Sequence, residues 1–280
     1  MQCRKREYTA ETEEKAMKIG FIGLGNMASA MMGALVKKGI FHPDEIIGAD
    51  VSEAAVKKAQ ETLGITAAAG NRETAARADV LVLSVKPQFY PDVIAQIRDV
   101  VDEKKIVVTI APGKTLQWLQ EQFGHPVKLV RCMPNTPALV LEGCTGVCPG
   151  ELVEPEELET VLTILQSFGK AYVVPERLMD VVVGVSGSSP AYVFLFIEAL
   201  ADAAVAEGMP RAQAYEFAAQ AVLGSAKMVL ELGKHPGELK DMVCSPAGTT
   251  IQAVRVLEEK GFRAAVMDAA IACIETSKKL

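Results

Sequence analysis

Residues 23–28 read Gly-Leu-Gly-Asn-Met-Ala and directly follow a short apolar stretch, residues 19–22. This Gly-x-Gly-x-x-Ala pattern is typical of the turn that holds the pyrophosphate in dinucleotide-binding units. Gly23 permits a tight turn, Gly25 leaves room beside the backbone, and Ala28 keeps the next helix close to the strand. A helix that begins at Asn26 or Met27 would offer free N–H groups to the phosphates. The pattern therefore predicts a bound dinucleotide, although a tight strand-to-helix turn in another α/β protein would look the same.

Asp50 follows a second apolar stretch, residues 46–49. An acidic residue at the end of the second strand can bind the hydroxyls of the adenosine ribose. A carboxylate there accepts a hydrogen bond from a free 2′-hydroxyl and repels a 2′-phosphate, so we expect NADH to be used at least as well as NADPH. Asn71 and Arg72, after the next strand, could contact the adenosine end and partly rescue NADPH binding.

Three further segments lie where a predicted strand ends: residues 84–87, 110–113 and 131–137. In an open α/β sheet, ligands bind at the carboxyl ends of the strands. Lys86 with its neighbours could contact the ribose or the nicotinamide, the small Ala111 would let the backbone approach a flat ring, and Asn135 offers hydrogen bonds. A loop lysine beside a turn proline, and ordinary strand-to-loop boundaries, explain the same residue types equally well.

Two segments precede predicted helices in the second half of the chain. Residues 245–250, Ser-Pro-Ala-Gly-Thr-Thr, combine two threonine hydroxyls with the free N–H groups of a helix N-terminus, which suits a bound carboxylate. The spacing from Thr249 to Gln252 also fits a capping box, and the two interpretations are compatible. Residues 186–190 end in Pro190, a residue suited to the first turn of the following helix.

The predicted strands and helices that position these residues change in type at about residue 175, which predicts two domains. Up to that point strands and helices alternate, which predicts an α/β fold with an N-terminal, Rossmann-type, doubly wound sheet over residues 17–175. The predicted strands are 19–22, 45–49, 80–85, 106–110, 127–132, 145–148 and 171–174. Residues 176–280 contain no strand pattern and predict an all-helical domain, with helices at 190–207, 211–232, 235–243, 249–260 and 262–279.

The predicted helix over residues 191–207 is apolar around most of its circumference. Such a helix needs burial on several sides, and a bundle of about 100 residues has little room for it. We therefore expect a homo-oligomer that assembles through the C-terminal domain. A single well-packed monomeric core is the alternative.

Composition narrows the function classes. The chain has 280 residues and a net charge of −6, which disfavours nucleic acid as a partner. Its six cysteines form no Cys-x-x-Cys pair and its three histidines are scattered, so we expect no metal site, reduced thiols and a cytoplasmic location. The longest uncharged stretch, residues 181–197, is interrupted by residues 186–190, so we expect no membrane span. Residues 1–16 are polar and are expected to be a disordered or non-native tail.

Taken together, these segments resemble the pyrroline-5-carboxylate reductase family over residues 17–280. The motifs that carry the resemblance are residues 23–28, 85–87, 133–137, 184–192, 245–250 and 257–263. The resemblance implies an oxidoreductase that transfers hydride from NAD(P)H to L-1-pyrroline-5-carboxylate and so makes L-proline, the last step of proline biosynthesis. It also implies a helical dimerisation domain, homodimers that often assemble into homodecamers, and a substrate bound at the dimer interface.

The resemblance assigns residues to both ligands. The expected cofactor-binding residues are Gly23, Leu24, Gly25, Asn26, Met27, Asp50, Asn71, Val85, Lys86, Pro87, Ala111 and Asn135. The expected substrate-binding residues are Val243, Ser245, Ala247, Gly248, Thr249 and Thr250. In this assignment the backbone of residues 247–249 holds the substrate carboxylate, and the catalytic Thr250 hydroxyl lies near the ring nitrogen.

This chain departs from the family pattern at two positions. The family commonly has Gly at the place of Ala247, so the backbone there must suit a residue with a methyl group and the loop is expected to differ slightly. The family commonly has Ala at the place of Pro112, which has no N–H and therefore cannot donate a hydrogen bond.

The substrate motifs contain no histidine or carboxylate that could protonate the imine. Either the substrate binds already protonated, or Thr250 and water supply the proton. Three other functions compete with this one: a hydroxy-acid dehydrogenase, a reductase of a different imine, and a ligand-binding protein that kept the fold without the reaction. The first usually needs a lysine on the long helix between the domains, and residues 188–207 contain none.

Overall fold

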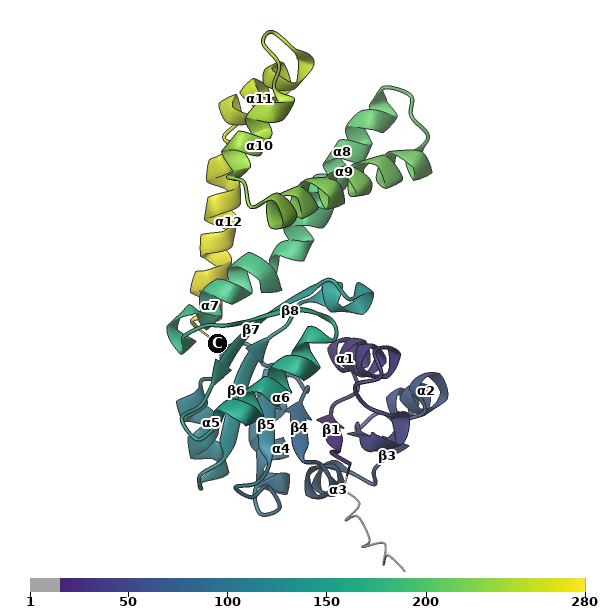
Figure 1. Cartoon of the computed structure of the whole chain (residues 1–280), viewed down its shortest axis with the longest axis vertical. Coiled ribbons are helices and arrows are strands. Elements are labelled where there is room, and N and C mark those ends of the chain that lie inside the picture. The colour runs from purple at the N-terminus through teal and green to yellow at the C-terminus, as the bar shows by residue number, and fades with distance from the viewer. Residues whose placement is uncertain (1–15, 280) are drawn as a thin grey trace, which may run out of the picture. The chain divides into compact units, whose positions relative to one another are not determined.

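The structure is a computed structural model that describes residues 16–279 (Figure 1). The chain folds as two compact units that alternate along the sequence. Of the described residues, the first unit holds 16–111, 116–131 and 149–167, and the second holds 112–115, 132–148 and 168–279. The predicted boundary at residue 175 stays a prediction. The expectation for residues 1–16 falls, apart from Ala16, outside the described residues.

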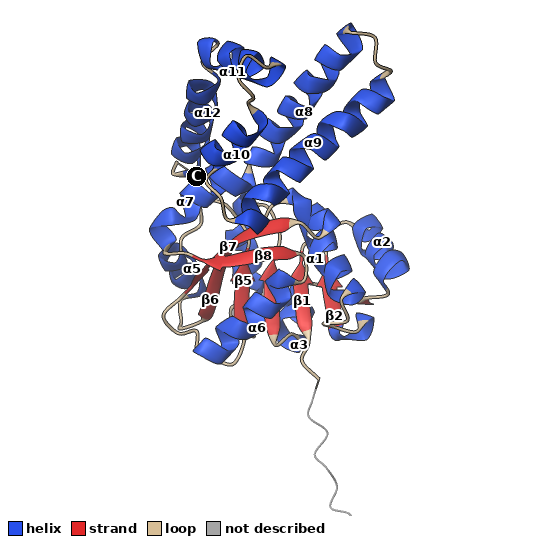
Figure 2. Cartoon of the chain, turned by 45° about the horizontal axis from the view of Figure 1, so that its top comes forward, coloured by secondary structure: helices blue, strands red, loops and turns tan. Residues whose placement is uncertain are grey.

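Within the described residues, eight strands form one sheet in the order β3-β2-β1-β4-β5-β6-β7-β8. Figure 2 shows the strands of this sheet in red. The strands are β1 Ile19–Ile22, β2 Ile46–Ala49, β3 Thr66–Ala67, β4 Val80–Leu83, β5 Ile106–Thr109, β6 Lys128–Met133, β7 Gly143–Pro149 and β8 Gly169–Val173. β1 pairs in parallel with both β2 and β4, so the chain reverses its direction of travel across the sheet at β1. The predicted doubly wound α/β fold is confirmed, and such a reversal is where these sheets bind ligands.

Every residue of β1, β2, β4 and β5 is buried, which explains why these strands read as continuous apolar runs. The helices of the first unit are α1 Asn26–Lys37, α2 Glu53–Leu63, α3 Asn71–Arg77, α4 Tyr90–Ile97, α5 Leu116–Phe123 and α6 Pro155–Gln166. The strand expected before Asn71 is β3, and no bounds were predicted for it because two residues are too few to show a periodic pattern.

The second unit contains the short 3-10 helix Thr136–Val140, the strands β7 and β8, and the C-terminal helices. These helices are α7 Met179–Val182, α8 Ser189–Ala206, α9 Arg211–Leu232, α10 Pro236–Val243, α11 Thr249–Glu259 and α12 Phe262–Ser277. α8 and α9 form a helical hairpin (Figure 1). α7 was not predicted. The boundaries of α8 to α12 lie within two residues of their predictions, because glycines such as Gly233, at φ 62°, stop the helices.

The segment before α8 differs from the prediction. Residues 183–187 form a π-helical turn that joins α7 to α8, so residues 186–190 do not interrupt the apolar stretch. By length and composition alone, the helical segment Glu176–Ala206 could cross a membrane. An 18-residue stretch within it has a mean hydropathy of 1.5, and only 11 % of that stretch is buried. The reasoning that residues 186–190 break this stretch was therefore wrong, and the absence of a membrane partner stays a prediction.

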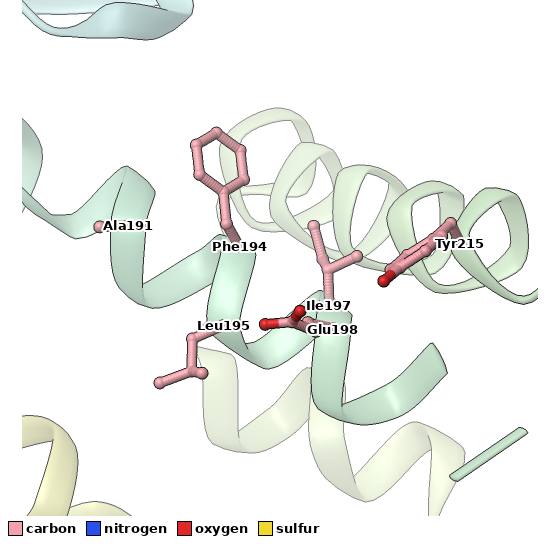
Figure 3. A pocket seen from close by; sticks show the side chains of 6 residues that line it. All are labelled: Ala191, Phe194, Leu195, Ile197, Glu198 and Tyr215. Carbon is pink, nitrogen blue, oxygen red and sulfur yellow. The ribbon is translucent and has the colours of Figure 1, made fainter. Parts of the chain in front are cut away.

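The helix α8 exposes most of its apolar side chains. Ala201 is its only buried residue, whereas Phe194 and Leu195 are 61 % and 67 % exposed. Phe194, Leu195, Ile197 and Glu198 line an open hollow to which α9 contributes Tyr215 (Figure 3). An apolar surface of this kind marks an interaction site, because the second unit alone supplies no core that covers it.

Candidate functional site

The glycine-rich turn between β1 and α1 has the shape that the sequence predicts. Gly23 adopts φ +95°, and a Cβ there would lie 2.9 Å from the backbone carbon of Ser84, so both conformation and space require glycine. A Cβ on Gly25 would meet nothing within 4 Å. Gly25 is also the N-cap of α1, which has no side-chain cap. The turn therefore offers open space beside uncapped N–H groups, and these features fit a dinucleotide pyrophosphate.

Asp50 lies next to this turn and holds it. Its Oδ2 accepts a hydrogen bond of 2.7 Å from the Leu24 N–H, and its Oδ1 accepts one of 2.8 Å from the Ser52 N–H. Each carboxylate oxygen has a further lone pair, so ribose hydroxyls can still donate to Asp50. The sequence pattern indicates only the ribose contact; the clamp on Leu24 became visible because the fold brings together residues 26 positions apart.

The end of β4 lies against the same turn. The Ser84 hydroxyl donates to the carbonyl oxygens of Ile22 and Gly23, at 3.0 and 2.7 Å. A Cβ on Gly23 would also lie 2.9 Å from Val85 Cγ1, which places Val85 beside the turn. Lys86 is exposed and caps the 3-10 helix Pro87–Phe89, and Ala111 is buried just after β5. The first unit thus gathers Gly23, Asp50 and Val85 at one edge of its sheet.

Asn71 and Arg72 begin α3 and bind side chains near α4. The Asn71 amide donates to Gln96 Oε1 at 2.9 Å, and Arg72 Nη1 lies 2.5 Å from Asp99 Oδ1. The Arg72 guanidinium lowers the pKa of the Asp99 carboxyl through this hydrogen bond. A contact between Arg72 and a cofactor phosphate would therefore compete with Asp99.

Asn135 belongs to the second unit, where its buried side chain joins three segments. Its Nδ2 donates to the Ser186 carbonyl at 2.9 Å, and its Oδ1 accepts from the Cys144 N–H at 2.8 Å. Asn135 therefore ties the loop after β6 to β7 and to the π-helical turn, a role that sequence reasoning missed. Its expected contact with the cofactor stays a prediction.

Asn135→Asp is expected to lower the free energy of unfolding by about 1–3 kcal/mol, because a buried carboxylate oxygen would face the Ser186 carbonyl without a donor between them. Thermal unfolding followed by circular dichroism measures the loss. Asn71→Asp is the matched control, since its amide is exposed and the change there should stay within about 0.5 kcal/mol. Equal melting temperatures for the Asn135 variant and the unmodified protein would contradict the role assigned to this amide.

The hydroxyls of residues 186–189 are engaged within the second unit. Ser186 and Ser189 donate to the carbonyls of Val182 and Val185, at 3.1 and 2.6 Å. Cys273 Sγ donates to the Ser188 hydroxyl at 3.2 Å. A hydrogen bond with Cys273 also raises the pKa of Tyr192. These serines and Cys273 connect the start of α8 to α12.

The predicted substrate loop runs from α10 to α11. Gly248 N–H donates to the Ser245 carbonyl at 3.0 Å, Pro246 follows Ser245, and Ala247 adopts φ +59°. These are the features of a type II turn, which needs a positive φ at its third residue. A Cβ on Gly248 would lie 2.3 Å from Ser245 Oγ, so a larger residue there would force the Ser245 hydroxyl to rotate away. Ala247 reaches the small left-handed region, at a cost of roughly 1–2 kcal/mol for an L-residue.

Helix α11 begins immediately after this turn, without a side-chain cap. Its N-cap is Gly248, so Thr249 is the first helical residue and the capping box expected between Thr249 and Gln252 does not form. Among residues 16–279, no hydrogen bond to the Thr250 hydroxyl is found. Val243 is exposed at the end of α10, and Thr250 is half-buried. The loop therefore presents uncapped N–H groups and a hydroxyl that is available to a ligand.

In the described part of the chain, no group of three or more His, Cys, Asp or Glu side chains is placed to hold a metal ion.

Comparison with known proteins covers nearly the whole chain. Residues 18–113 match the family described as NADP oxidoreductase, coenzyme F420-dependent, and residues 176–280 match the family described as pyrroline-5-carboxylate reductase dimerisation. The pyrroline-5-carboxylate reductase of Escherichia coli K12 is 56 % identical over 263 residues, 94 % of this chain and 98 % of the relative. The enzyme of that name from Methanosarcina acetivorans is 48 % identical over 94 % of this chain and 97 % of its own.

Solved structures give the same result. A pyrroline-5-carboxylate reductase from Coxiella burnetii is 33 % identical, with a TM-score of 0.87 over 94 % of this chain and 98 % of the other. A pyrroline carboxylate reductase from Plasmodium falciparum with NADP bound is 32 % identical, with a TM-score of 0.86 over 94 % of this chain and 97 % of the other.

Proposed function

The chain belongs to the pyrroline-5-carboxylate reductase family, whose members reduce L-1-pyrroline-5-carboxylate to L-proline with NAD(P)H. On that premise, we propose which residues of this chain bind the substrate and the cofactor and take part in the reaction. This reaction is the last step of proline biosynthesis. The observation that carries the proposal is the turn Ser245–Gly248, followed by the uncapped N-terminus of α11 and the available Thr250 hydroxyl. These groups match an anionic ring with one basic nitrogen.

For the cofactor, we assign the pyrophosphate to the turn between β1 and α1 and the ribose hydroxyls to Asp50. The open space beside Gly25 and the uncapped N–H groups of α1 support the first assignment. The free lone pairs of Asp50 support the second. Val85, Lys86 and Pro87 follow β4 at the same edge of the sheet and are assigned to the ribose or nicotinamide.

In the reaction, bound NAD(P)H would supply the hydride that adds to the carbon of the ring C=N bond. The N–H groups at the start of α11 hold the substrate carboxylate, and the Thr250 hydroxyl hydrogen-bonds the ring nitrogen. Because the substrate motifs contain no histidine or carboxylate, we assign the proton to a substrate that binds protonated, or to Thr250 and water. Catalysis then depends mainly on orientation and on preorganised dipoles.

For the assembly, residues 176–280 match a dimerisation domain, so the chain forms homo-oligomers. We propose homodimers that assemble further into homodecamers, located in the cytoplasm and without nucleic-acid or membrane partners. The exposed apolar face of α8 supports the first step.

One assay tests the function directly. NAD(P)H oxidation is followed with L-1-pyrroline-5-carboxylate and with other cyclic imines, and NAD(P)⁺ reduction is followed with a panel of 2-hydroxy acids. Turnover with the first substrate well above all others is expected. Equal or higher turnover with a hydroxy acid or another imine would replace the proposal, and binding of the dinucleotide without any turnover would favour a ligand-binding protein.

Asp50 is expected to set the cofactor preference, because its charge repels a 2′-phosphate. The unmodified enzyme should show a kcat/KM for NADH at least equal to that for NADPH, and Asp50→Ser should shift this ratio toward NADPH by about tenfold, or about 1.4 kcal/mol. Steady-state kinetics with both cofactors measure the ratio. Glu53→Gln removes a nearby exposed charge that does not contact the turn, and should leave the ratio unchanged. A strong preference of the unmodified enzyme for NADPH would contradict this role.

A further inference from the structure

Ala247 is one of only two non-glycine residues with a positive φ in the described chain, and it lies in the substrate loop. The turn Ser245–Gly248 has its closing hydrogen bond, from Gly248 N–H to the Ser245 carbonyl, at 3.0 Å. The alternative type I turn keeps the same closing bond and accepts Pro246 equally well at its second position. The two turns differ in the orientation of the Pro246–Ala247 peptide and in the sign of φ at Ala247.

The side chain of Ala247 biases this choice against the conformation that the structure shows. An L-residue disfavours the left-handed region by a factor of roughly five to thirty in population. A glycine would carry no such bias, because it has no Cβ. The flip would also turn the Ala247 N–H, one of the groups assigned to the substrate carboxylate, away from its present direction. The orientation of a single peptide therefore decides whether the Ala247 N–H can join the Gly248 and Thr249 N–H groups on the carboxylate.

We infer that Ala247 is a positioning residue that makes the substrate loop a two-state element, in which the carboxylate of the imine selects the type II turn over a type I turn. The inference rests on the proposed function of this loop. A site that is competent in only a fraction of molecules has its affinity lowered by that fraction. Ala247 therefore weakens binding of the imine and of proline, which share the carboxylate, and leaves the hydride-transfer step and the cofactor site unaffected.

The test is a graded series at one position. Ala247→Gly should lower the KM for L-1-pyrroline-5-carboxylate, by at most roughly five- to thirtyfold, with kcat and the KM for NAD(P)H unchanged. Ala247→Val should raise the same KM, because a β-branched side chain disfavours a positive φ more strongly. The inhibition constant of L-proline should follow the same order as the KM across Gly, Ala and Val.

Leu141→Gly is the matched control, because Leu141 has the second positive φ, 65°, and lies outside the substrate loop. It should relieve backbone strain and leave the KM for the imine unchanged. An Ala247→Gly variant whose KM for the imine is unchanged or raised, in an enzyme that turns this substrate over, would overturn the inference. The failure of the proposed function looks different, since the unmodified enzyme would then not reduce the imine at all.

Discussion

Replacing Thr250 by alanine is expected to lower kcat/KM for L-1-pyrroline-5-carboxylate by about ten- to a hundredfold. The hydroxyl has no partner among residues 16–279, so its hydrogen-bonding capacity is available to the substrate. Losing one hydrogen bond to a charged or developing ammonium group costs roughly 1–3 kcal/mol, which corresponds to this change in rate. Initial-rate kinetics with the imine, together with fluorescence titration of NAD(P)H, separate the two ligands.

Thr250→Ser is the matched control, because it keeps the hydroxyl and removes only a methyl group. It should retain most of the activity, and NAD(P)H should bind to both variants about as tightly as to the unmodified enzyme. Unchanged kinetics in Thr250→Ala would exclude the hydroxyl from the reaction. A loss of NAD(P)H binding equal to the loss of kcat/KM would mean that the variant disturbs the fold and not the substrate.

Leu195→Glu is expected to dissociate the homo-oligomer and to abolish most of the activity. Leu195 is 67 % exposed on α8 and lines the hollow in Figure 3 together with Phe194 and Glu198. Covering a leucine contributes about 1.5–3 kcal/mol, and leaving an unpaired carboxylate in a dry interface costs several kcal/mol more. Glu198, three positions away on the same helix, adds like-charge repulsion. In a symmetric dimer each effect occurs twice.

Light scattering over a range of protein concentrations measures this change. The unmodified chain should have a multiple of the 29.9 kDa mass of one chain, and Leu195→Glu should approach that mass itself. Leu152→Glu places the same charge at an exposed leucine of the first unit and should leave the assembly intact. An unmodified protein that is monomeric at every concentration would refute assembly through α8, and an intact oligomer in Leu195→Glu would exclude this face.

The strands and helices that were predicted well are those whose bounds are set by residues close to them in the sequence. β1 and the start of α1 followed from apolar residues and two glycines within ten positions, because the turn needs a positive φ at Gly23 and space at Gly25. α9 was placed at its observed bounds because Pro210 precedes it and Gly233 ends it. The π-helical turn at residues 183–187 escaped prediction, because Ser-Gly-Ser-Ser-Pro resembles a helix break unless tertiary contacts hold it wound. Gly184 supplies such a contact: a Cβ there would lie 2.5 Å from Ile274.

The amino-acid pattern was enough to predict the fold class, a dinucleotide at the first loop and a carboxylate at the second, since periodicity, glycine spacing and hydroxyl-rich helix starts are local properties; the substrate itself followed only from the resemblance to a family. Tertiary structure alone decided that Asp50 clamps the Leu24 N–H and that Asn135 holds Ser186, because these partners are 26 and 51 positions apart. It also decided the conformation of Ala247. An alanine after a proline is compatible with either turn, and only the packed loop shows the left-handed backbone that its methyl group disfavours.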